Sequence, residues 1–140
     1  MSTEENKAIV HRVYSEVINA GNLDRADAFI AVNMIEHEEF PGIGPGLAGF
    51  KQVIGMFRAA FPDMTFTAED TIAEGDHVVA RFTMRGTHRG ELMGIPATGK
   101  SVKINGIDIA RISGGKISEH WGQMDTMGLM QQLGAIPTPG

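Results

Sequence analysis

A single carboxylate stands in the middle of an apolar pattern in the segment SVKINGIDIARI, residues 101–112. Alternate residues of an extended strand point to the same side of a sheet. Asp108 therefore shares one face with small and apolar residues: Val102, Ile104, Gly106, Ala110 and Ile112. Either this face is solvated, or the Asp108 carboxyl group is buried and can donate a hydrogen bond in its protonated form.

Histidines and further carboxylates provide other groups that could transfer protons. His37 lies between carboxylates in MIEHEEF, and His120 and Asp125 lie in KISEHWGQMD. Imidazole titrates near neutral pH and suits acid–base catalysis. The sequence contains no HExxH or facial-triad spacing, and EHEEF on a strand would place alternate side chains on opposite faces, so no metal is predicted. The absence of cysteine excludes a thiolate nucleophile.

Asp108 and His120 belong to two runs that flank Gly114 and Gly115, a pair that tolerates the positive φ angles of a tight turn. We predict a long β-hairpin. A strict two-residue turn would pair Asp108 with Trp121 on one face, which would make Trp121 a core or pocket-wall residue.

The remaining elements must position these groups. Helical periodicity predicts an amphipathic helix from Thr3 that ends at Gly21, a short helix over 23–30 and a third helix over 47–61. Strands are predicted over 34–40, 65–73 and 77–88, a loop over 90–99, a final helix over 127–133 and a tail over 137–140. This order predicts an α+β fold, with helices on one face of a curved antiparallel sheet that encloses a pocket.

Composition limits the possible partners. A length of 140 residues predicts one domain over 1–140, and a formal net charge of −5 argues against nucleic acid or an anionic membrane as partner. The acidic N-terminus does not resemble a signal peptide, and no apolar run approaches the length of a membrane span. We therefore expect a cytoplasmic protein.

Three motifs carry a resemblance over nearly the whole chain. The loop GELMGIPATGK, the run IDIARISGGKISEHW and the ending MDTMGLMQQLG resemble the SnoaL-like polyketide cyclase (ester cyclase) branch of the NTF2-like superfamily. The resemblance implies a cone-shaped α+β domain that forms a homodimer through the outer face of its sheet. It leaves the chemistry open, because the superfamily includes cyclases, isomerases, hydrolases, dehydratases and binding domains on one scaffold.

Position by position, the resemblance implies a mixed set of site residues. The acid–base aspartate of the cyclases aligns with Gly122, and Asp125 could replace it only if the last strand bulges. The same alignment turns His120, Gly122 and Met124 inward, in place of Trp121. Compared with ketosteroid isomerase, Asp108 and Tyr14 align with the oxyanion-hole pair.

The catalytic base of ketosteroid isomerase also aligns with His37 of this sequence. Together these matches imply a cofactor-free cyclase, isomerase or lyase that acts through an enolate on a small hydrophobic carbonyl compound. His37 would be the base, Tyr14 and Asp108 would stabilise the enolate, and His120 or Asp125 would assist proton return. Two alternatives remain: a non-catalytic small-molecule-binding domain, and an epoxide hydrolase that uses Arg81 with Asp108.

The pocket of any of these proteins would be apolar. The predicted substrate-pocket residues are aromatic side chains, methionines and one histidine near the loop mouth: Trp121, Phe57, Phe82, Met84, Met93, Met124 and His88.

Overall fold

A computed structural model describes residues 1–137 of the chain. The predicted tail reaches residues 138–140, which lie outside the described part. The elements in chain order are α1 (Thr3–Arg12), η1 (Val13–Asn19), η2 (Leu23–Ala28), β1 (Ile30–Glu36), α2 (Gly46–Ala60), β2 (Thr65–Glu74), β3 (His77–Thr87), β4 (Ser101–Ser113), β5 (Lys116–Met124) and α3 (Thr126–Leu133). Among these residues no helix is long and apolar enough to cross a membrane.

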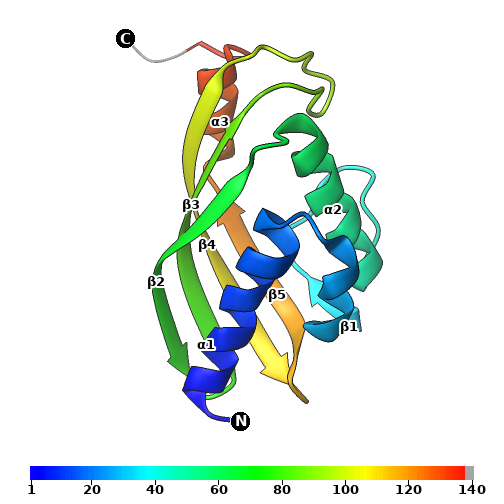
Figure 1. The fold of residues 1–140 in the computed structure, drawn as a ribbon, viewed down its shortest axis with the longest axis vertical. Helices are drawn as coiled ribbons and strands as arrows, with labels where there is room; N and C mark the ends of the chain where they lie inside the picture. Colours follow the sequence, from blue (N-terminus) through cyan, green and yellow to red (C-terminus); the bar gives the residue numbers. More distant parts are fainter. Residues whose placement is uncertain (138–140) are drawn as a thin grey trace.

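The five strands form one open sheet in the order β1-β5-β4-β3-β2. Neighbouring strands are antiparallel except for β1, which runs parallel to β5. Helices α1 and α2 lie over one face of the curved sheet, and α3 packs near the end that carries the loop between β3 and β4 (Figure 1). The α+β prediction is confirmed, whereas the purely antiparallel sheet was wrong because β1 adds to the free edge of β5 in the parallel direction.

Strand β1 begins earlier than the sequence predicted. It starts at Ile30, which pairs with Ile117, and it ends at Glu36 opposite His120. The predicted strand over 34–40 therefore overlaps β1 only in its first half. Residues 37–45 instead form the connection from β1 to α2.

The first helix begins as its sequence predicted, although Ser2 rather than Thr3 is the capping residue. The Ser2 hydroxyl accepts a hydrogen bond from the Glu5 backbone N–H, and the Glu5 carboxylate accepts one from the Ser2 N–H. The helix continues through the π-helical segment η1 and ends near Gly21, whose φ of +69° suits glycine. Segment η1 thereby brings Tyr14 to the sheet.

A β-bulge in the long hairpin decides which residues face the helices. Ser113 pairs with Lys116 and Ile112 with Ile117, but Arg111 pairs with Glu119, so Ser118 is an extra residue in β5. The shift of one residue turns the side chains after the bulge over to the other face. The pairing of Asp108 with Trp121 is therefore wrong; Asp108 pairs with Gly122, as the family alignment implied.

Helix α2 packs closely against the connection that precedes it, and one glycine makes this possible. A Cβ atom at Gly49 would overlap the carbonyl oxygen of Gly44, whereas a Cβ at Gly55 would be 3.6 Å from Leu23, an ordinary contact.

We predict that Gly49→Ala lowers the free energy of unfolding by about 1–3 kcal/mol, because the new methyl group forces the backbone apart. Gly55→Ala in the same helix is the matched control and should be neutral or stabilising by up to about 1 kcal/mol, since alanine favours the helix. Urea unfolding of both variants tests this prediction, and equal stability of the two would contradict it.

Candidate active site

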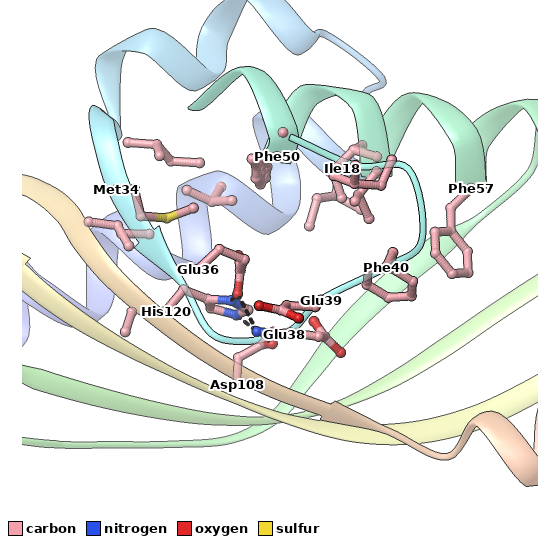
Figure 2. A pocket seen from close by; sticks show the side chains of 18 of the residues that line it. Ile18, Met34, Glu36, Glu38, Glu39, Phe40, Phe50, Phe57, Asp108 and His120 are labelled. Atoms are coloured by element: carbon pink, nitrogen blue, oxygen red, sulfur yellow. Dashed lines mark hydrogen bonds and ion pairs between the residues drawn. The ribbon is translucent and has the colours of Figure 1, made fainter. Parts of the chain in front are cut away.

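The helices and the concave face of the sheet enclose a cavity of about 700 Å³. Most of its lining is apolar and comes from α1, η1, β1, α2 and the sheet; three predicted pocket residues, Phe57, Phe82 and Met124, contribute to it. The polar groups gather at one end, where Figure 2 shows Glu36, Glu38, Asp108 and His120 directed toward one another. The cavity thus has an apolar body and a single titratable end.

Four side chains at this end form a continuous hydrogen-bonded chain. The Tyr14 hydroxyl donates to Oδ2 of Asp108 at 2.5 Å. Oδ1 of Asp108 lies 2.9 Å from Nε2 of His120, and Nδ1 of His120 lies 2.6 Å from Oε1 of Glu36. One side chain comes from a helix and three from neighbouring strands, so the chain links η1 to β4, β5 and β1.

His120 is held between two carboxylates. Burial alone would lower the pKa of His120, but the hydrogen bonds and negative charges of Asp108 and Glu36 outweigh burial and raise that pKa to about 10. Both ring nitrogens therefore carry protons at neutral pH and donate, one to each carboxylate. The site contains a buried imidazolium.

The arrangement around Asp108 differs from the expected role of this residue. One of its oxygens accepts from Tyr14 and the other faces the protonated His120, so both oxygens act as acceptors. Asp108 lies in the cavity as predicted, but its hydrogen bonds are not those of an acid that donates to a ligand. Burial and the negative charge of Asp108 raise the pKa of Tyr14, which stays a neutral donor.

Glu38 provides a second kind of carboxyl group. It follows β1 and points into the cavity, and its backbone N–H donates to Oε1 of Glu36 at 2.9 Å. Burial and the negative charges of Asp108 and Glu36 raise the pKa of Glu38 to about 7, although the positive charge of His120 opposes them. Glu38 therefore exchanges its proton near neutral pH.

The predicted base, His37, lies outside the cavity. Its ring stacks on Trp121 with centroids 4.9 Å apart and an interplanar angle of 6°, and Nε2 lies 2.7 Å from Oε2 of Glu119. Successive residues of an extended chain alternate between faces, so Glu36 and Glu38 point inward while His37 points outward. Trp121, a predicted pocket residue, faces the same outer side because of the bulge.

The other predicted site residues lie outside the cavity lining. Asp125 caps helix α3 by accepting from the Gly128 N–H at 2.9 Å, and it does not line the cavity. Met84 and His88 are fully buried in the core, away from the cavity lining, and Met93 is exposed at a loop tip with a φ of 45°. Arg81 pairs with Asp70 and does not approach Asp108, so the epoxide hydrolase arrangement is not assembled.

The predictions missed Glu36, Glu38 and Glu39, all of which line the cavity. A signal for two of them was present: Met34 is an apolar residue on β1, and residues 36 and 38 share its face at a period of two. His37, the residue of this segment with the pKa best suited to a base, lies on the opposite face.

Glu38, Asp108 and His120 also offer ligand atoms within 4.8 Å of one another. A metal-binding histidine must present the lone pair of an unprotonated nitrogen. Both nitrogens of His120 face carboxylates and the raised pKa keeps them protonated. A cation bound here would therefore have to displace a proton of His120 and the hydrogen bond that this proton makes.

Comparisons with known proteins agree with this architecture. The family model described as SnoaL-like polyketide cyclase matches residues 8–133. Nogalonic acid methyl ester cyclase of Streptomyces nogalater is 32% identical over 118 residues, which cover 83% of this chain and 88% of that protein. Aklanonic acid methyl ester cyclase DnrD of Streptomyces peucetius is 33% identical over 132 residues, which cover 89% of this chain and 88% of that protein.

Among solved structures, TsrD from Streptomyces laurentii superimposes with a TM-score of 0.89 at 29% identity, covering 97% of this chain and 99% of that chain. The NTF2-like α+β fold expected from the sequence is confirmed.

The raised pKa of Glu38 has a measurable effect on stability. Because the folded pKa of about 7 exceeds the usual 4.5, the folded chain binds more protons than the unfolded chain in this interval, and stability is lost as pH rises through it. We predict that Glu38→Gln removes this loss, so that the variant gains stability relative to the wild type between pH 5 and pH 8. Urea unfolding over this range measures the difference.

Asp63→Asn is the control. Hydrogen bonds from the Thr87 backbone N–H and hydroxyl lower the pKa of Asp63 below 3.8, so its contribution is lost only in more acidic solution. Its stability difference from the wild type should stay constant between pH 5 and pH 8. A constant difference for Glu38→Gln as well would show that Glu38 titrates normally.

Proposed function

The chain belongs to the family of SnoaL-like polyketide cyclases, and on that premise we propose that it closes a ring in a hydrophobic carbonyl compound by acid–base catalysis through an enolate. The observation that carries the proposal is the convergence of titratable groups at one end of an otherwise apolar cavity. The reaction needs no cofactor, because it is a proton transfer followed by bond formation within one molecule.

The proposed reaction is an intramolecular aldol addition. A carboxylate at the polar end removes a proton from the carbon beside one carbonyl group, and the resulting enolate carbon attacks a second carbonyl carbon of the same molecule. A carbon–carbon bond forms, the second carbonyl oxygen becomes an alkoxide, and the proton is returned to it. A carboxyl group whose pKa is near the working pH can perform both transfers.

The hydrogen-bonded chain would stabilise the negative charge of the enolate. The His120 imidazolium places a positive charge beside the reacting carboxyl group, and the Tyr14 hydroxyl donates to the Asp108 carboxylate that holds this imidazolium. Fixed charges and donors in a site of low polarity stabilise a developing oxyanion strongly. Asp108 would hold both groups in place, since it accepts a hydrogen bond from each.

The size and lining of the cavity favour a fused-ring or similarly broad apolar substrate. Pockets of about 300–1,000 Å³ bury most of the surface of a drug-sized ligand, and this cavity has about 700 Å³. Two relatives are named as cyclases of nogalonic and aklanonic acid methyl esters. Methyl esters of this kind are therefore the first substrates to test.

We predict that Tyr14→Phe and Asp108→Asn each lower kcat on such an ester by about 100-fold or more, because Asp108 loses its hydrogen bond or its charge and no longer holds the imidazolium that stabilises the enolate. Asp70→Asn, a carboxylate paired with Arg81 outside the cavity, is the matched control and should retain the wild-type rate. Cyclised product is quantified by chromatography, and circular dichroism confirms that each variant is folded.

Wild-type rates in both cavity variants would contradict the mechanism. Tight binding of these compounds by the wild type, without conversion of any of them, would favour the non-catalytic binding domain.

A further inference from the structure

We propose that Glu38 is the group that transfers the proton, and that Gly122 is a glycine because the Glu38 carboxylate occupies the space above it. This inference deepens the proposed function and depends on it. Glu38 lies in the connection between β1 and α2, whereas Gly122 lies on β5, so the reacting carboxylate comes from a loop and rests on the sheet.

Glu38 and Glu39 have carboxylates without a hydrogen-bond partner among residues 1–137, and of the two Glu38 is half-buried whereas Glu39 is exposed. Asp108 uses both oxygens as acceptors, and His120 uses both nitrogens toward carboxylates. Oε1 of Glu36 accepts from His120 and from the Glu38 backbone. Within residues 1–137, no hydrogen bond to the Glu38 side chain competes with a substrate for its oxygens.

The Glu38 carboxylate packs closely against β5 of the sheet, above Gly122. Gly122 is buried and pairs with Asp108 of β4. A Cβ atom added there would lie 2.5 Å from Oε1 of Glu38, 2.8 Å from its Cδ and 2.9 Å from Cε1 of His120. These distances are shorter than real Cβ contacts, so a side chain at position 122 would have to displace the Glu38 carboxylate, and glycine leaves that space to it.

The same geometry accounts for the chemistry. At this position the Glu38 carboxylate lies beside the imidazolium of His120. A carboxylate oxygen of Glu38, a carboxylate oxygen of Asp108 and a ring nitrogen of His120 lie within 4.8 Å of one another. Burial beside two carboxylates raises the pKa of Glu38 to about 7, which agrees with a group that takes a proton and returns it. The proton moves from the substrate carbon to Glu38 and from Glu38 to the new alkoxide, so the residue ends as it began.

Glu36 serves as a positioning residue for this arrangement. Its Oε1 accepts from Nδ1 of His120 at 2.6 Å and from the Glu38 N–H at 2.9 Å. One carboxylate thus fixes both the imidazolium and the backbone that carries the proposed base.

The test is to move the carboxylate from one backbone position to the other. We expect Glu38→Gln and Glu38→Ala to lower kcat on the methyl ester by about 100-fold or more. The double variant Glu38→Ala/Gly122→Asp should recover at least about tenfold of the lost rate, because an aspartate at 122 would place its carboxylate in the vacated space. Gly122→Asp alone should be impaired, since the two side chains would compete for one volume.

Glu119→Gln is the matched control, because its carboxylate lies on β5 but faces outward toward His37 and Arg111. It should keep the wild-type rate. The pH profile of kcat provides a second measurement: the wild type should show an acidic limb near pH 7, which should be absent from the residual activity of Glu38→Gln. Circular dichroism establishes that the variants are folded.

The outcomes distinguish the role of Glu38 from the proposed function. A wild-type rate and an unchanged pH profile in folded Glu38→Gln would overturn the role of Glu38 and leave the proposed function standing. Loss of activity in Glu38→Gln without recovery in the folded double variant would overturn the inference that a carboxylate from position 122 can occupy the same space as that of Glu38. If the wild type converts no carbonyl substrate, the proposed function fails, and this inference fails with it.

Discussion

The contact on which the site depends is the pair of hydrogen bonds from His120 to Asp108 and Glu36. An unpaired charge in such a buried position would be strongly unfavourable. The imidazolium and its two carboxylates therefore depend on one another, because removal of either partner leaves a buried charge without its counter-charge. Because Asp108 also binds Tyr14, the interaction connects the edge strand β1, the central hairpin and the first helix. The hydrogen bonds of His120 and Asp108 therefore both hold the polar wall of the cavity together and fix the positive charge within it.

The carboxyl groups of the polar end have different surroundings, although they lie close together. Asp108 and Glu36 each accept a hydrogen bond from His120, whereas the Glu38 side chain accepts none from the described residues. Burial and the negative charges of Asp108 and Glu36 outweigh the positive charge of His120 and raise the pKa of Glu38 toward neutrality. Neighbouring groups whose environments differ in this way can divide the work of a site, with some holding charge and another exchanging a proton.

The resemblance placed an acid–base aspartate where this chain has Gly122, which made catalysis doubtful on alignment alone. The structure changes the meaning of that glycine, because the space above it contains the carboxylate of a residue from a different segment. An alignment compares backbone positions, but catalysis depends on where the oxygen atoms lie. Loss of a side chain at one position therefore does not show loss of the group that the site needs.

Local pattern was enough to predict most elements and to place Asp108 on one face of β4 with small and apolar residues, because periodicity and turn residues act over a few neighbouring positions. It left open whether that face is solvated or faces a pocket. It did not determine the bulge at Ser118 or the position of β1. These depend on how each strand packs against partners distant in sequence, and a shift of one residue exchanges the two faces. The sequence left His120 and Trp121 as alternatives, and it pointed to His37 where Glu38 faces the cavity, so the identity of the inward groups was decided by the tertiary structure.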